Sequence, residues 1–135
     1  MKVRFKNLKK YFNDEQIETI KTFVQFIQGE TSLKKDVQIT FVDERTGPMT
    51  TGMRIPFHKI KVLASGRMLI DVLRTLSHEW VHEFEHQKLG LKEKIKIKDI
   101  GGLEENLANI LSGVFMKKFQ KEYPEFEKIL YNEKK

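Results

Sequence analysis

Apolar residues recur at helical spacing in four stretches of the chain. The first stretch follows Asn13, which forms a capping-box pattern with Gln16, and Gly29 supplies a stop at its end. Pro124 opens the fourth stretch, a position that suits the first turn of a helix. The spacing predicts helices over residues 14–28, 67–89, 103–120 and 124–131.

Apolar and polar residues alternate in two further segments, as in strands with one buried face. These segments are residues 37–42 and 53–64, and Gly47-Pro48 between them is a turn signal, so the two arms are expected to form a hairpin. Pro56 removes a backbone donor from the second arm, which predicts an edge strand. A short third strand is expected around residues 95–97.

A single domain is expected over residues 1–135, because this length suffices for one hydrophobic core and is short for two. The predicted elements indicate an α+β fold. A small antiparallel sheet of about three strands would pack on the helices 14–28 and 67–89, and the helix 103–120 would cross below.

Composition limits the class of protein. Apolar residues make up 39% of the chain and charged residues 33%, and no apolar run has the length of a membrane span, so no membrane association is expected. Cysteine is absent, which excludes disulfides and thiolate metal sites. No secretory signal is visible at the basic N-terminus, so a cytoplasmic location is expected.

The chain carries a modest excess of positive charge. The net charge of +6 arises from 25 basic and 19 acidic side chains. Such an excess attracts anionic partners at long range, although lysines scattered over solvated faces are a simpler explanation. Nucleic acid is therefore only a secondary expectation as a partner.

The second predicted helix contains the motif His78-Glu79-Trp80-Val81-His82. Positions i and i+4 of a helix lie on one face, so both imidazoles can point at one metal ion with Glu79 beside them. Glu83 breaks the uncharged surroundings of the motif and is expected at a solvent-facing turn. The alternative is a pair of surface histidines on an ordinary amphipathic helix. The apolar stripe on the opposite side consists of Leu69, Leu73, Leu76, Trp80 and Phe84.

A catalytic zinc site usually has three protein ligands, so the two histidines of the motif require a third. No histidine follows His86, which is expected at the rim of the site or facing solvent, so a downstream ligand must be a carboxylate. Glu105 is the best candidate, and Glu104 and Asp99 are alternatives.

The helix that carries Glu105 has two different faces. The face of Glu105 is small or polar, which would let this helix approach the metal helix closely; it contains Ala108, Asn109 and Ser112. The apolar face is expected to pack on the body of the protein; it contains Leu107, Leu111 and Val114.

Glu105 and Asn109, placed downstream of His-Glu-x-x-His, resemble the second motif of the gluzincins, in which the glutamate is the third zinc ligand. The closer resemblance is to the small ImmA/IrrE-type metallopeptidases and their phage-encoded relatives, which combine the first motif with Glu-x-x-Ala-Asn. This resemblance spans about residues 53–115. It implies a minimal zincin-like domain with zinc as cofactor and with the metal ligands His78, His82 and Glu105.

The resemblance also implies hydrolysis of peptide bonds in a peptide or protein substrate. Glu79 would be the general base that takes a proton from water and passes it to the leaving amine. Asn109 would orient one of the histidines. The substrate would lie extended along the edge strand, near residues 58–62, and a phage-encoded member would act in the host cytoplasm.

Two other functions remain open. The protein could be a regulatory or interaction module that retains the metal but catalyses no reaction. The presence of Glu79 argues against this function, because Glu79 has no structural role in the motif. A SprT-like protease associated with nucleic acid would suit the positive charge, but the third histidine of that type is missing. The oxyanion donor is open as well, with His58 as one candidate.

Overall fold

The computed structural model of the protein describes the chain except for residues 46, 48, 90–102 and 132–135. Its strands are β1 (Val3–Lys6), β2 (Val37–Val42), β3 (Gly52–Ile55) and β4 (Lys59–Leu63). Its helices are α1 (Leu8–Tyr11), α2 (Asp14–Glu30), α3 (Leu69–Leu89), α4 (Leu103–Glu122), the 3-10 turn η1 (Pro124–Phe126) and α5 (Glu127–Tyr131). The predicted α+β class is confirmed.

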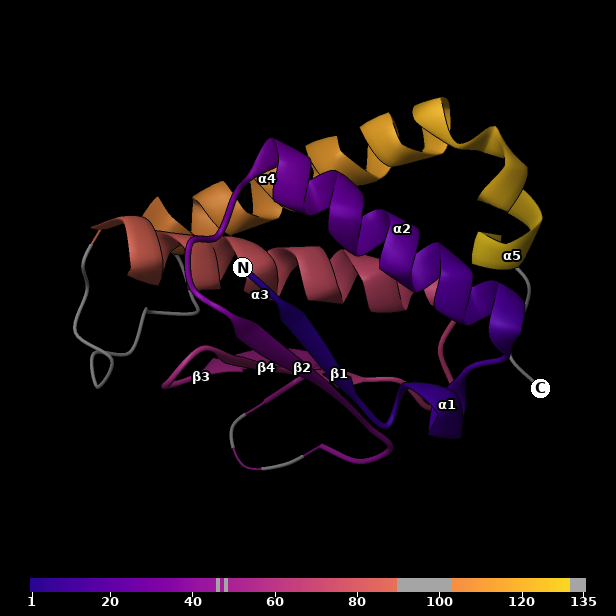
Figure 1. The fold of residues 1–135 in the computed structure, drawn as a ribbon, viewed down its shortest axis with the longest axis horizontal. Helices are drawn as coiled ribbons and strands as arrows, with labels where there is room; N and C mark the ends of the chain where they lie inside the picture. Colours follow the sequence, from indigo (N-terminus) through magenta and orange to yellow (C-terminus); the bar gives the residue numbers. More distant parts are fainter. Residues whose placement is uncertain (46, 48, 90–102, 132–135) are drawn as a thin grey trace.

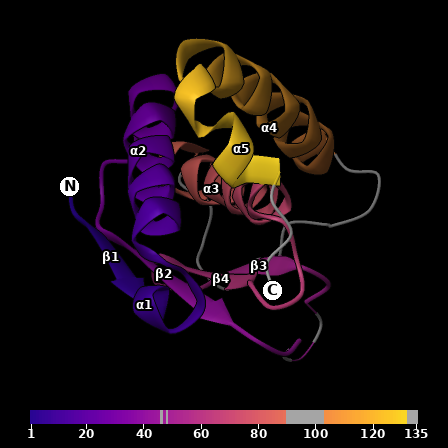
Figure 2. The same cartoon turned by 90° about the vertical axis from the view of Figure 1, so that its right-hand side faces the viewer.

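The sheet and the long helices form layers (Figure 1). α2, α3 and α4 lie on the same side of the sheet, and the view in Figure 2 places α3 between the sheet and α4. α3 contacts β3 and β4 on one side and α4 on the other. A membrane crossing would need a longer apolar run than any described helix contains.

The sheet is mixed, whereas an antiparallel sheet was predicted. In the strand order β1-β2-β4-β3, β1 is parallel to β2 and β2 is parallel to β4, while β3 and β4 are antiparallel. The predicted hairpin between residues 37–42 and 53–64 is therefore wrong. β1 and β2 are parallel because the chain returns between them through α1 and α2.

Residues 53–64 contribute to two strands rather than one. Pro56, Phe57 and His58 turn the chain between β3 and β4, and Phe57 and His58 adopt left-handed φ angles of 68° and 64°. β4 lies between β2 and β3, so the edge strand is β3. Pro56 thus marks the turn at the end of the edge strand. The strand expected at residues 95–97 lies outside the described residues.

The helix boundaries follow the sequence signals closely. The capping box of α2 is confirmed, because the Asn13 side chain accepts a hydrogen bond from the Gln16 backbone and the Gln16 side chain accepts one from the Asn13 backbone. α2 continues through Gly29 to Glu30. α3 begins at Leu69, two residues later than predicted.

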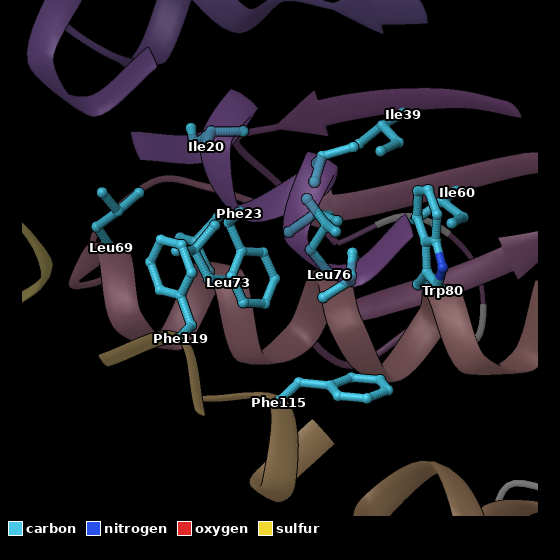
Figure 3. Packing of buried hydrophobic residues seen from close by; sticks show 14 of the residues in the cluster. Ile20, Phe23, Ile39, Ile60, Leu69, Leu73, Leu76, Trp80, Phe115 and Phe119 are labelled. Atoms are coloured by element: carbon cyan, nitrogen blue, oxygen red, sulfur yellow. The ribbon is translucent and has the colours of Figure 1, made fainter. Parts of the chain in front are cut away.

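The hydrophobic core lies between α3, the sheet and α2. The predicted stripe of α3 points into it and is fully buried, apart from the half-buried Phe84. Figure 3 shows Leu69, Leu73, Leu76 and Trp80 of this stripe facing residues of α2, β2 and β4, which are Ile20, Phe23, Ile39 and Ile60. Phe119 of α4 closes the core, with its ring centroid 5.0 Å from that of Phe23.

α4 packs on the body of the protein through the face that carries Glu105, which was predicted to face only the metal helix. Its expected apolar face is turned outward, because Leu107 and Val114 are exposed and Leu111 is only half-buried. The buried face instead contains Glu105, Ala108, Ser112, Phe115 and Phe119. The prediction failed because α4 carries apolar residues on both sides, and Glu105 must face α3 to reach the histidines.

Candidate metal centre

The structure brings together the three residues that the sequence singled out as ligands. His78 and His82 come from consecutive turns of α3, and Glu105 comes from the first turn of α4. The Nε2 atoms of the histidines are 3.2 Å apart. Glu105 places Oε1 2.6 Å from His78 Nε2 and Oε2 3.3 Å from His82 Nε2. One ligand atom from each residue lies within 4.8 Å of the others, so the group could hold a metal ion.

The spacing and burial of these atoms fit a metal ion. Ligand atoms about 2.1 Å from a tetrahedral ion lie about 3.4 Å from one another, close to two of the three separations found here. Glu105 Oε2 is buried and has no hydrogen-bond partner among the described residues. Since a buried carboxylate oxygen needs a partner, a cation held with His78 and His82 would satisfy it.

Small side chains let α4 come close enough for Glu105 to reach α3. Ala108 and Ser112, one and two turns after Glu105, are both buried. The Ser112 hydroxyl donates to the backbone oxygen of Asn109, so its polar group is satisfied within α4. The predicted close approach is confirmed for Ala108 and Ser112, whereas Asn109 of the same predicted face is exposed.

Glu85 orients His82, one of the two histidines. Glu85 Oε1 lies 2.9 Å from His82 Nδ1, and both side chains are almost fully buried. The carboxylate therefore holds the proton on Nδ1 and leaves Nε2 free to face the ion. Asn109 is exposed, and a role for it in orienting His78 stays a prediction. The signal for Glu85 was present, since it follows His82 by three residues on the same helix face.

The carboxylates around His82 alter its protonation. Burial by itself would lower the pKa of His82, but the hydrogen bond that it donates to Glu85 and the negative charges of Glu79, Glu85 and Glu105 outweigh this effect. The net effect raises the pKa above its ordinary value of 6.5. In the metal-free protein, protonated His82 thus stabilises the fold below pH 6.5, and this contribution is lost as the pH rises through the raised pKa.

Metal affinity is expected to depend on pH through His82. Because the ion needs the neutral imidazole, affinity for a divalent cation should fall as the pH drops through the raised pKa, by up to about tenfold per pH unit. Calorimetric titration between about pH 8 and about pH 6 measures this dependence and the proton released. In Glu85→Gln, which keeps the hydrogen bond but removes the charge, the fall should begin at lower pH. A flat affinity over this range would contradict the expectation.

Glu79 is buried beside the candidate metal ligands and close to β3. A Cβ atom added at Gly52 would lie 3.2 Å from Glu79 Cγ and 2.4 Å from Thr75 Cγ2. β3 therefore passes α3 at a distance that only glycine permits. Glu79, the general base predicted from the motif, therefore lies next to β3 at the edge of the sheet.

Glu83 is buried, although a solvent-facing position was predicted for it. Its carboxylate forms a salt bridge with Arg54 and lies against His58 Nδ1. His86 is also buried, so it does not face solvent, and its alternative place at the rim of the site stays a prediction. The charged partners of Glu83, Arg54 and His58, lie far away in the sequence, so its burial has no local charge signal.

The other candidate ligands lie beyond what the structure describes. Asp99 is outside the described residues, and the side chain of Glu104 is not among those described, although its backbone belongs to α4. Among the described residues, the group His78, His82 and Glu105 is the one that could hold a metal ion.

Comparison of the chain with protein-family models, with curated proteins and with solved structures found no match in any of the three.

Proposed function

We propose that the protein is a zinc-dependent metallopeptidase of the gluzincin type. The observation that carries the proposal is the convergence of His78, His82 and Glu105 with a buried glutamate, Glu79, next to them. A nitrogen and oxygen donor set of three residues suits zinc and leaves one position for water or substrate. Zinc bound there would acidify water and polarise the carbonyl group of a peptide bond.

Glu79 performs the proton transfers in this proposal. Its carboxylate takes a proton from the attacking water and returns it to the nitrogen of the leaving amine. Burial on the helix between the two ligands keeps the carboxylate at a fixed distance from the site. Glu85 holds the His82 ring through Nδ1, so this ligand does not rotate away during turnover.

The substrate is an extended peptide that pairs with β3. Residues 58–62, the expected location, are excluded because β4 is already paired with β2 and β3. The backbone N–H of Leu63 donates to Thr51 O, so alternation along the antiparallel pair turns the backbone groups of Gly52 and Arg54 toward the free edge. Within the described part of the chain, no strand occupies that edge. A peptide strand could add there next to Glu79.

Two variants with adjacent substitutions test the ligand set. Purified protein should contain about one zinc per chain, and Glu105→Ala should lose most of it because one of three ligands is gone. Glu104→Ala is the matched control and should retain zinc. The zinc content of each variant is measured after dialysis. If Glu104→Ala loses zinc and Glu105→Ala retains it, the third ligand is Glu104.

A peptide-library digest tests the activity itself. The zinc-loaded protein should cleave peptides, a chelator should stop the cleavage, and added zinc should restore it. Glu105→Ala should lose hydrolysis together with zinc. A zinc-loaded protein that cleaves no peptide in an unbiased library would count against the peptidase and in favour of a metal-binding module.

A further inference from the structure

The carboxylate of Glu83 joins α3 to β3 and to the turn between β3 and β4. The Glu83 side chain is 0% exposed. Oε1 accepts a hydrogen bond from Arg54 Nε on β3 at 2.8 Å, and Oε2 lies 2.6 Å from Nδ1 of His58, the turn residue just before β4. Glu83 follows the ligand His82 directly, so this contact lies one residue from the metal centre.

Gln87 extends the network to a third part of the chain. Its Nε2 donates to Glu83 Oε2 at 2.6 Å. Its Oε1 accepts from the backbone N–H groups of Lys34 and Lys35, at 2.8 and 2.9 Å, in the segment that leads into β2. The position of Glu83 is thus fixed from the side of the sheet as well as by α3.

β3 and α3 contact each other at two points that are about equally spaced along the strand and along the helix. Gly52 lies against Glu79, and Arg54 binds Glu83. Two residues of a strand span about 6.8 Å and four residues of a helix span about 6.0 Å, so both contacts can form only in one alignment. A shift of one residue would turn Arg54 away from Glu83 and bring a Cβ atom against Thr75.

The hydrophobic pattern of β3 does not fix this alignment. All four residues of β3 are half-buried, without the alternation that normally specifies strand register. The turn that follows is also strained, because the non-glycine residues Phe57 and His58 both have left-handed φ angles. A buried ion pair is a poor source of stability compared with apolar residues of similar volume, so the pair suits a role in positioning.

We propose that Glu83 is a positioning residue that clamps the β3–β4 hairpin on α3 and so sets the register of a peptide bound along β3 relative to Glu79. The clamp is a property of the fold, and its consequence for peptides rests on the peptidase function proposed above. The carboxylate does not touch the reacting atoms. It acts through Arg54 and His58 on the strand that would pair with the substrate.

Hydrogen exchange in Glu83→Gln tests the clamp without any substrate. The amides of Met53 and Ile55 should exchange about tenfold faster or more than in the wild type, while zinc affinity and the exchange of β2 stay unchanged. Glu18→Gln, which removes an exposed charge on α2, is the control and should change neither. Unchanged exchange in β3, or a loss of zinc affinity in Glu83→Gln, would overturn the proposal.

Kinetics then test the consequence for peptides. KM for peptides long enough to reach Arg54 should rise about tenfold or more in Glu83→Gln, with little change in kcat, while short peptides keep their KM. The double variant Glu83→Met, Arg54→Met should regain stability but not the wild-type KM, which separates positioning from folding. It also replaces Glu83→Gln as the test if Glu83→Gln does not fold. An equal loss of kcat for all peptides would overturn the proposal. If the wild type cleaves no peptide, the proposed peptidase function is wrong, and the hydrogen-exchange experiment alone tests whether Glu83 holds the hairpin on α3.

Discussion

Replacing Glu79 with glutamine is expected to lower kcat for peptide hydrolysis by about 10²–10⁴-fold, with zinc content and fold retained. The glutamine amide can form a hydrogen bond to water but cannot accept its proton. The change is nearly isosteric, so the close contact of residue 79 with Gly52 is preserved. Activity should be measured on protein whose zinc content has been determined, so that a loss of metal is not mistaken for a loss of base.

Glu79→Asp provides the matched control. It keeps a carboxylate but withdraws it by one methylene group, so the base is present at a greater distance and partial activity is expected. A ranking of wild type, Glu79→Asp and Glu79→Gln in falling order would support proton transfer by this residue. Unchanged hydrolysis in zinc-loaded Glu79→Gln would exclude Glu79 as the base.

Local spacing was enough to predict which residues come together in a group that could hold a metal ion. The i, i+4 relation of His78 and His82 is a property of any helix, and it needs no knowledge of the fold. Glu105 required one further step, the assumption that its helix returns to the motif. The structure fulfils this assumption although the outward face of α4 was predicted incorrectly, because the small residues beside Glu105 determine how closely the helices approach.

The arrangement of the strands could not be predicted in the same way. Alternation identifies a strand and its buried face, but the choice of partner depends on how the intervening chain returns. β1 was missed because its alternating apolar residues, Val3 and Phe5, span a strand of only four residues. Without β1, the segments 37–42 and 53–64 were paired across the turn signal at Gly47-Pro48, which led to the wrong hairpin.

The two buried glutamates after the motif show where sequence reasoning ends. Glu85 acts on His82, three residues away, so its role could have been derived from helix geometry. Glu83 binds Arg54, which lies 29 residues earlier in the chain. A charged residue is expected to face water unless a partner is known. For Glu83 that partner becomes visible only after β3 has been placed on α3.

Trp80→Ala is expected to lower the free energy of unfolding by about 3–5 kcal/mol. The indole is completely buried against the sheet, and its Nε1 donates to the backbone oxygen of Thr31 at 2.9 Å. A domain of this size is stabilised by about 5–15 kcal/mol in total, so the variant should unfold at a much lower urea concentration. Because Trp80 is the only tryptophan, the transition has to be followed by circular dichroism.

Trp80→Phe separates the two parts of this effect. Phenylalanine keeps most of the apolar contact but leaves the buried Thr31 oxygen without its donor, which should cost about 1–3 kcal/mol. If the two variants lose the same stability, the hydrogen bond from Trp80 to Thr31 at the end of α2, rather than core contact, would account for the stabilising effect of Trp80. The difference matters for the metal centre, because Trp80 lies between Glu79 and His82 in sequence and points to the opposite side of α3. In Trp80→Ala, zinc binding should weaken only in proportion to the fraction of unfolded protein. A larger loss of zinc affinity would show that the core contact of Trp80 also determines the geometry of the metal centre.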